Sequence, residues 1–228
     1  MHDIAEFPML QENLRDIFTN PSLGSIKRNV SPGQVLCEPT SPAENLYFIE
    51  SGQVRVYQVA PDGNGRLNEI LGSDDWFGTP ALAEHAQYGN RVVAVGPVVI
   101  WEVPAKSLLR FLNNQPVAAV ELIKQLAAKH VAHMAESSEL IFDDCNSRLL
   151  KTLLRFSTSS AATPIGDESV VLRITHEQLA QAIGAARETI SLALTQLRKQ
   201  NLLRTGRNQL FFSPRVLQNF ATKTDKDE

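Results

Sequence analysis

Residues 175–204, which read THEQLAQAIGAARETISLALTQLRKQNLLR, decide the architecture of the C-terminal part of the chain. Thr175 is followed three residues later by Gln178, which is the capping box of a helix start. Gly184 supplies the backbone freedom for a sharp turn between two helices. In the second helix apolar residues recur at spacings of four and three, so one face is buried. The stretch therefore predicts a helix-turn-helix.

The exposed side of the second predicted helix carries residue types that read DNA. Arg187 in its first turn has the planar, two-pronged donor that pairs with guanine in the major groove. Glu188 can accept from a cytosine amino group or orient Arg187, and Ser191 can contact a base or the backbone. Beyond the helix, Arg204 and Arg207 lie in a basic β-hairpin, residues 203–204 and 210–212, which reads as a wing and a phosphate contact. We expect this unit to bind DNA.

The distribution of charge agrees with that expectation. Residues 1–143 contain 10 Lys and Arg against 17 Asp and Glu, whereas residues 144–228 contain 12 against 8. An acidic N-terminal part joined to a basic C-terminal part suits a regulatory domain attached to one that meets phosphates.

Composition excludes several other classes of protein. With 43% hydrophobic and 21% charged residues the chain resembles an ordinary soluble globular protein, and no apolar run approaches the roughly 20 residues of a membrane span. The first residues lack the basic start and apolar core of an export signal. Cys37 and Cys145 are too few for a disulfide framework or an iron–sulfur cluster. We expect a cytoplasmic protein with no membrane contact.

The N-terminal part predicts a short amphipathic helix over residues 10–18 and then a period of two. Pairs that form turns, such as Pro32-Gly33 and Gly96-Pro97, separate short β-rich runs. Such strands predict an antiparallel barrel or jelly roll over about residues 24–104, hence an α+β protein. The runs are 34–37, 46–49, 54–59, 67–71, 91–95 and 98–103.

A helical region follows the predicted barrel. After a short helix over 105–112 and a break at 113–116, residues 117–142 predict one helix of about seven turns. One stripe of this helix has alternating spacings of three and four, a heptad seam that suits pairing with a second copy. A second stripe, Leu122, Leu126 and His133, suits packing on the barrel. The predicted dimer contacts are Val120, Ile123, Ala127, His130, Met134 and Ile141.

Asp144 is a plausible cap for a helix over 145–156, which places a hinge at residues 143–144. Residues 158–169, rich in Ser, Thr, Ala and Pro, predict a connecting loop. We therefore divide the chain into a barrel unit (1–112), a long helix (113–143), a winged helix-turn-helix (144–221) and a disordered tail (222–228).

In this order of elements the chain resembles the CRP/FNR family of bacterial transcription regulators along almost its whole length. The residues that carry the resemblance are Gly33-Gln34-Val35-Leu36, Leu46-Tyr47-Phe48-Ile49, Ser51 through Val56, Arg148-Leu149-Leu150, and Gly184 through Leu197 with Arg187-Glu188-Thr189. The resemblance implies a homodimer that reads a palindromic site with two recognition helices and works with RNA polymerase.

The resemblance adds DNA contacts and shows departures from the family pattern. Thr175, His176 and Thr189 match family positions near phosphates, although an arginine is commoner where His176 stands. Leu192 stands where catabolite activator proteins carry a second guanine-reading arginine. The half-site should therefore differ at one step, for instance by favouring a thymine methyl group. Ala186 replaces the usual Ser or Thr cap of the recognition helix.

The same comparison disfavours cyclic AMP as the effector. Family members that bind it use an acid for the ribose and an Arg-Ser pair for the phosphate. Here Thr79 stands where the acid would be, and Arg91 falls about three residues late and precedes Val92 instead of serine. His133-Met134 replaces the Thr-Ser pair of the long helix. The candidate effector pocket is Gly78, Thr79, Arg91, Val92, His133 and Met134.

Haem is a second alternative, because imidazole and thioether groups ligate haem iron. The candidates are His85, His130, His133 and Met134. Another small molecule, or no effector at all, is favoured over both, and the cofactor stays unidentified.

Catalytic motifs are missing from the sequence. It contains no Gly-x-Ser-x-Gly elbow, no Gly-x-x-x-x-Gly-Lys phosphate loop and no His-Glu-x-x-His metal motif. We therefore expect a DNA-binding regulator and no enzyme. The alternative is a ligand-binding or haem-based sensor of the same fold that acts mainly through its effector or a protein partner.

Overall fold

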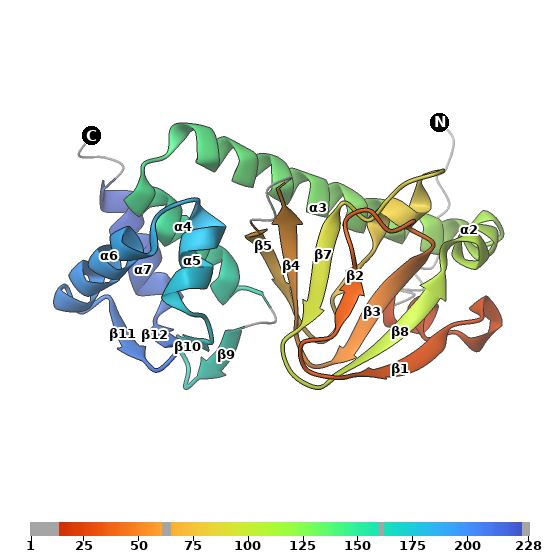
Figure 1. Cartoon of the computed structure of the whole chain (residues 1–228), viewed down its shortest axis with the longest axis horizontal. Helices are drawn as coiled ribbons and strands as arrows, with labels where there is room; N and C mark the ends of the chain where they lie inside the picture. Colours follow the sequence, from red (N-terminus) through yellow and green to blue (C-terminus); the bar gives the residue numbers. More distant parts are fainter. Residues whose placement is uncertain (1–13, 61–64, 160–161, 225–228) are drawn as a thin grey trace, which may run out of the picture.

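A computed structural model describes residues 14–60, 65–159 and 162–224 of the chain. A β-roll and a winged helical domain lie side by side, and the long helix α3 (Pro116–Phe142) runs along both (Figure 1). The α+β architecture expected from the sequence is confirmed.

The β-roll consists of two four-stranded antiparallel sheets that face each other across an apolar core. One sheet has the order β1-β8-β3-β6, and the other β2-β7-β4-β5. All six predicted runs are strands, but β1 and the short β6 were not predicted. Both pair with strands that are distant in sequence, β1 with β8 and β6 with β3. The strands are β1 (Ile26–Val30), β2 (Val35–Cys37), β3 (Asn45–Ser51), β4 (Val54–Val59), β5 (Gly65–Leu71), β6 (Trp76–Phe77), β7 (Asn90–Ala94) and β8 (Val98–Pro104).

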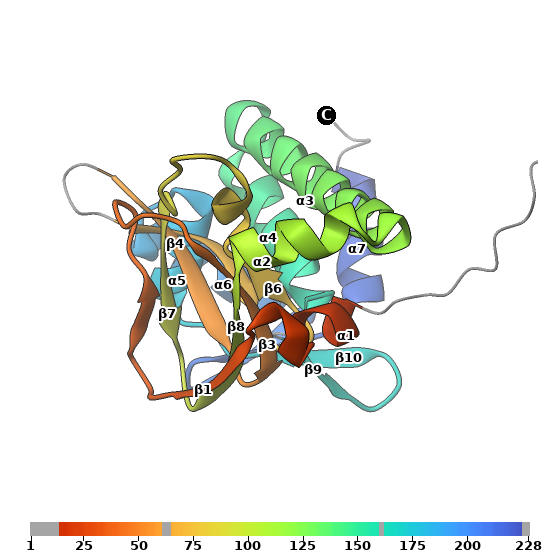
Figure 2. The ribbon, with the colours of Figure 1, turned by 90° about the vertical axis from the view of Figure 1, so that its right-hand side faces the viewer.

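Helices cover one end of the roll, as the view in Figure 2 shows for α2 and α3. α1 (Leu14–Phe18) is the described part of the predicted N-terminal helix, whose residues 10–13 lie outside the described residues. Phe18 stacks on Phe48 with ring centroids 5.7 Å apart, and α2 (Ala105–Asn113) adds the buried Leu108 to the same cluster. Two 3-10 turns, η1 (Pro21–Leu23) and η2 (Thr79–Leu82), complete this unit.

The long helix has one side on the roll and another that is uncovered. Leu122 is buried in the cluster around Phe18, and Leu126 packs against that cluster, so the stripe expected to pack on the barrel does so. The break before α3 and the cap after it also match expectation, because Asp144 Oδ1 accepts from the backbone N–H of Ser147 at the start of α4 (Cys145–Ser157).

The winged domain differs from the prediction at residues 158–169, which were expected to form a loop. They contain most of a β-hairpin, β9 (Ala162–Ile165) and β10 (Ser169–Leu172), and β10 pairs with the wing strand β12. The strands exist because β12 supplies hydrogen-bond partners that local composition does not reveal. Pro164 is tolerated because β9 is an edge strand.

The remaining elements follow the expected order. They are α5 (His176–Ile183), α6 (Arg187–Lys199), β11 (Leu203–Gly206), β12 (Gln209–Phe212) and α7 (Pro214–Thr224). α7 extends through Thr224, so residues 222–224, expected to be disordered, belong to a helix. Residues 225–228 lie outside the described residues.

Candidate nucleic-acid interface and effector pocket

Local hydrogen bonds set the geometry of the helix-turn-helix. The Thr175 hydroxyl accepts from the backbone N–H of Gln178 at 3.1 Å, and the Gln178 side chain accepts from the Thr175 N–H at 3.0 Å, which confirms the capping box. Gly184 ends α5 with a φ of 71°, a conformation that glycine adopts at little cost. Leu179 and Ile190 are fully or almost fully buried, so α5 and α6 share one apolar core.

The N-terminal turn of α6 is open to solvent. Arg187, Glu188 and Thr189 are exposed, and Ala186 makes no side-chain capping bond, as its sequence predicted. Within the described part of the chain no hydrogen-bond or ion-pair partner of the Arg187 guanidinium is found. One turn later Leu192 is 73% exposed on a helix whose other leucines are buried. These side chains are therefore available to an outside partner.

The hydroxyl group of Ser191 is already engaged inside the motif. Ser191 Oγ donates to the backbone carbonyl of Arg187 at 2.9 Å and lies 3.0 Å from Nδ1 of His176, the first residue of α5. Thr175 is likewise occupied as a cap acceptor. Of the predicted DNA contacts, Thr175, His176 and Ser191 thus have side-chain partners within the motif.

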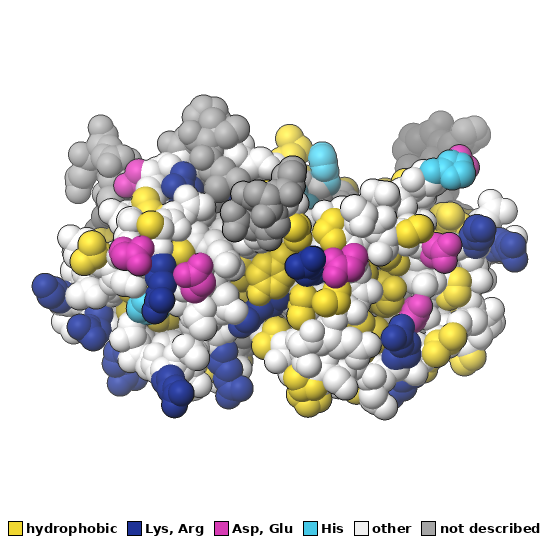
Figure 3. Space-filling view, in the orientation of Figure 1, with side chains coloured by type: hydrophobic (Ala, Val, Ile, Leu, Met, Phe, Trp, Pro, Cys, Tyr) yellow, Lys and Arg dark blue, Asp and Glu magenta, His cyan; other side chains and the backbone are white. Residues whose placement is uncertain are grey.

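The wing extends the basic surface. Arg204 on β11 and Arg207 in the turn before β12 are exposed. Lysine and arginine side chains gather over the winged domain in Figure 3, on the side of α6 and the wing. A surface that combines a protruding helix and a cationic rim matches the needs of major-groove binding.

A β-roll strand completes the core of the winged domain. Leu67 and Ile70 on β5 are buried in the same cluster as α5 and α6. Two arginines add bonds across this interface, Arg66 Nε to the carbonyl of Ala182 at 3.3 Å and an Arg55 Nη to the carbonyl of Arg173 at 3.4 Å. The two domains are thus joined by more than the hinge at 143–144.

A β-bulge in β5 lets this strand contribute side chains both to the core of the winged domain and to a cavity on its other side. Val56 on β4 pairs with Glu69, but the next residue, Tyr57, pairs with Leu67, so β5 has one extra residue between them. As a result Leu67 and Ile70 face the winged domain, while Glu69 and Leu71 line a cavity on the other side.

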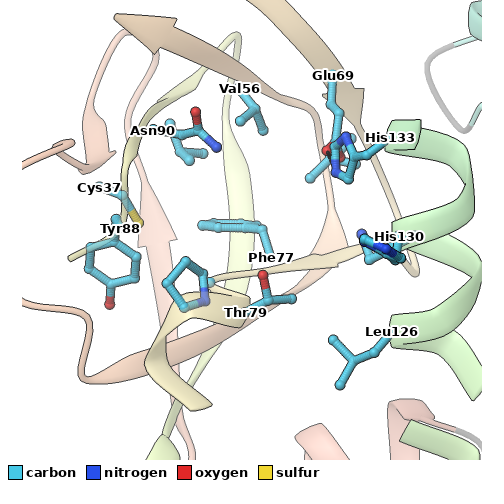
Figure 4. Close-up of a pocket in the computed structure, with 15 residues that line it drawn as sticks. Cys37, Val56, Glu69, Phe77, Thr79, Tyr88, Asn90, Leu126, His130 and His133 are labelled. Atoms are coloured by element: carbon cyan, nitrogen blue, oxygen red, sulfur yellow. Dashed lines mark ion pairs between the residues drawn. The ribbon is translucent and has the colours of Figure 1, made fainter. Parts of the chain in front are cut away.

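This cavity, of about 270 Å³, lies between the β-roll and α3 (Figure 4). Phe77 lies across its centre, Cys37 and Tyr88 are at the end away from α3, and His130 and His133 reach in from α3. The other lining residues are Val56, Glu69, Leu71, Gly78, Thr79, Pro80, Asn90, Val92, Leu126 and Lys129.

Some of the residues predicted for the effector pocket line this cavity, and others do not. Gly78, Thr79, Val92 and His133 line the cavity, but Arg91 and Met134 do not. Arg91 alternates to the other face of β7, where its Nε donates to Glu38 at 2.9 Å. Met134 follows His133 by one helix position, which turns it toward the exposed side of α3.

Several lining residues were missed by sequence reasoning, because they come from strands, a turn and a helix that are far apart in the sequence. Glu69 is the most important, since His133 Nε2 lies 3.1 Å from its Oε1. Burial opposes the charge of Glu69, but the hydrogen bond from His133 and the charges of Lys129 and His133 outweigh it, so the pKa of Glu69 is lowered. The strand also carries Arg66 and Asn68, so a polar side chain on β5 gave no distinctive signal for Glu69.

The thiol of Cys37, at the far end of the cavity, is buried. Burial raises the pKa of Cys37 to about 12. Burial and the hydrogen bond with Tyr88 likewise raise the pKa of Tyr47. Lys129, in contrast, donates to the carbonyl of Trp76 at 3.2 Å and lies over its ring. Lys129, the lysine in the cavity lining, is thus already engaged by Trp76.

The haem candidates are dispersed. His130 and His133 line the cavity, whereas His85 and Met134 do not. Among the described residues no group of three or more His, Cys, Asp or Glu side chains is placed to hold a metal ion. Within the described ranges no helix combines the length and apolar character that a membrane span requires.

Chain comparisons locate both units in known families. The cyclic nucleotide-binding domain model matches residues 27–115, and the Crp-like helix-turn-helix model matches residues 147–219. A CRP-like cAMP-activated global transcriptional regulator of Mycobacterium tuberculosis is 27% identical over 172 residues, 75% of this chain and 77% of that protein. A probable transcriptional regulator, flp, of Lacticaseibacillus casei is 26% identical over 86% of this chain and 87% of its own.

Solved structures share the fold. FixK2 from Bradyrhizobium japonicum matches with a TM-score of 0.70 and 20% identity, covering 86% of this chain and 96% of its own. The c-di-GMP responsive regulator CLP of Xanthomonas campestris matches with a TM-score of 0.69 and 22% identity, covering 83% and 94%.

A β-roll joined by a long helix to a winged helix-turn-helix defines a class of DNA-binding transcription regulators with a sensor-type domain. The chain belongs to this class, and within it to the CRP/FNR family.

The lining does not fit the cyclic nucleotide that the first domain model implies. None of the residues lining the described cavity is an arginine, and Arg91 is bound to Glu38 outside it. Glu69 is the acid that the cavity contains, and it is engaged by His133. A phosphodiester would therefore be buried without a free cation, which is unfavourable.

Proposed function

We propose that two copies of this chain pair through α3 and read a palindromic DNA site with their α6 helices in successive major grooves, about 34 Å apart. The observation that carries this proposal is the exposed first turn of α6, where the Arg187 guanidinium stands without a partner among the described residues. Arg187 reads a guanine, and Glu188 accepts from a neighbouring cytosine or orients Arg187.

The uncovered side of α3 supports pairing. Val120, Ile123, Val131 and Met134 are between 50% and 65% exposed, a large apolar stripe for a helix in solvent. Val131 was not among the predicted contacts. Ala127 and His130 are also exposed, and the side chain of Ile141 lies outside the described residues. A second copy of α3 buries such a stripe in a coiled coil.

The remaining DNA contacts are supported by position. Leu192 offers its side chain to a thymine methyl group. Thr189 lies in the same exposed turn as Arg187, and Arg204 and Arg207 extend from the wing toward phosphates. The protein acts in the bacterial cytoplasm together with RNA polymerase, as a regulator and not as an enzyme.

The cavity between the β-roll and α3 holds the effector, a small molecule other than a cyclic nucleotide. By their names, the Mycobacterium tuberculosis relative is activated by cAMP and CLP of Xanthomonas campestris responds to c-di-GMP, but the lining here lacks a free cation for a phosphate. An effector that contacts His133 or Glu69 acts on α3 and β5 at once, and β5 also packs on α5. It thereby biases the orientation of the winged domain.

The test is selection of bound sequences from a random duplex pool by the purified full chain, with an absorbance spectrum of the same sample. We expect a palindromic motif, and loss of one guanine preference in Arg187→Ala, at a cost of about 1–3 kcal/mol. Arg110→Ala is the control, since Arg110 is an exposed arginine on α2, outside the winged domain.

If the Arg187→Ala variant still selects the same guanine, Arg187 does not recognise that base, and the proposed role of the first turn of α6 is wrong. A Soret band in the spectrum would show haem and refute the proposed effector class. Binding at full strength without any additive would refute gating by the cavity.

A further inference from the structure

His176 and Ser191 form a hydrogen-bonded pair that joins the two helices of the motif. His176 is the first residue of α5 and Ser191 lies in the second turn of α6, and their Nδ1 and Oγ atoms are 3.0 Å apart. Both side chains are half-buried, so the contact is shielded from water on one side.

The second bond of Ser191 determines which atom of the pair donates. A serine hydroxyl has one hydrogen, and that of Ser191 is directed to the carbonyl of Arg187 at 2.9 Å. With the serine hydrogen on that carbonyl, Ser191 Oγ accepts from His176, which assigns the ring the tautomer with its hydrogen on Nδ1. In the neutral ring the other nitrogen, Nε2, is then an acceptor without a hydrogen.

The position of His176 is one that meets the DNA backbone. In a bound helix-turn-helix the first helix crosses the backbone while the second enters the major groove. Free N–H groups at a helix N-terminus favour a phosphate there. Because Thr175 already caps this terminus as an acceptor, the His176 ring is the adjacent side chain with an unused nitrogen.

We infer that Ser191 is a positioning residue, which holds the His176 ring so that Nε2 meets a DNA phosphate, and that DNA binding is coupled to uptake of one proton at that nitrogen. This inference rests on the proposed function of α6. It replaces direct base reading by Ser191 with a role through His176.

The proton balance follows from the hydrogen-bond roles. In the neutral ring the lone pair on Nε2 faces a phosphate oxygen, which repels it. A proton taken from solvent turns Nε2 into a donor to the phosphate, while Nδ1–H continues to donate to Ser191 Oγ. Phosphate favours the charged ring, so affinity increases as pH falls through the range in which imidazoles titrate.

Other charges on the surrounding elements change little in that range. Carboxylates, lysines and arginines keep their charge near neutral pH. The other imidazole linked to these elements is that of His133, which contacts Glu69 on β5, and the His176→Gln variant separates its contribution from that of His176. The charged groups on these elements are Arg173 in the segment before α5, Glu177 on α5, Arg187 and Glu188 on α6, Arg148, Lys151 and Arg155 on α4, and Arg66 and Glu69 on β5.

The experiment measures the dissociation constant of the full chain for its selected duplex at constant salt, from about pH 8 to about pH 6. For the natural sequence we expect binding about tenfold tighter at the acid end, and less than about twofold change for His176→Gln. His176→Arg should bind tightly at both ends, since arginine keeps its charge. Ser191→Ala should lose most of the acid gain.

The matched control is His85→Asn, on a β-roll loop where the φ of 55° suits asparagine. It should keep the full pH dependence. An unchanged pH dependence in His176→Gln, or none in the natural sequence, would overturn the inference, and full dependence in Ser191→Ala would overturn the positioning role. Failure of the proposed function is separable, because it shows as base preference retained by Arg187→Ala.

Discussion

Leu67→Ala tests whether a β-roll residue belongs to the core of the winged domain. Leu67 is fully buried and packs in the cluster built by α4, α5, α6 and the wing. Truncating a buried leucine to alanine costs about 2–5 kcal/mol through lost burial and the cavity left behind. In a chain of this size about 3 kcal/mol corresponds to a fall in Tm of roughly 6–12 °C.

Thermal unfolding combined with amide hydrogen exchange measures both the size and the place of the effect. We expect amides of α5 to lose protection before those of β3, which packs in the roll away from this interface. Ile26→Ala is the control, because Ile26 is 59% exposed on β1, and it should change stability by less than about 0.5 kcal/mol. Equal loss of protection in α5 and β3, or no loss in α5, would refute the shared core.

Three further changes test the recognition helix, the cavity and the dimer. Leu192→Ala should lose preference at one base step by about 1 kcal/mol, seen as a flattened column in a selected motif, with the guanine read by Arg187 unchanged. Glu69→Gln should remove the part of stability that the lowered pKa of Glu69 confers. That part is present above the ordinary glutamate pKa of about 4.3 and is lost as pH falls through the lowered value, so urea midpoints of the variant should depend less on acid pH. Val131→Asp should yield monomers in sedimentation, because an exposed carboxylate in the α3 stripe would be buried in the pair, and an unchanged dimer would contradict that use of the stripe.

The helix-turn-helix could be predicted from sequence because its determinants are local. The capping box of Thr175 and Gln178, the left-handed Gly184 and the apolar spacing of α6 all act within a few residues of one another. The start of α4 was predicted from Asp144 for the same reason, because its capping hydrogen bond is local. The outward Arg187 followed once the buried face of α6 was known, because 3.6 residues per turn fix the opposite face.

Elements that depend on distant partners were harder to predict. The hairpin of β9 and β10 lies in a stretch of Ser, Thr, Ala and Pro, and it is ordered by the pairing of β10 with β12 about forty residues later. Arg91 was assigned to the effector pocket from its place in the chain. The pleat of β7 directs it instead to Glu38 on the outside, since neighbouring residues of a strand face opposite ways.

The sequence by itself determined the order of elements, the readable face of α6 and the apolar stripe of α3, because periodicity and capping are properties of short segments. Only the tertiary structure decided which residues line the cavity and which residues pack between the two domains. Glu69 contacts His133, and Leu67 packs in the winged core, because the bulge in β5 places these residues, two positions apart, on opposite sides of the strand. The pairing of His176 with Ser191 likewise required the angle between α5 and α6, which brings together side chains fifteen positions apart.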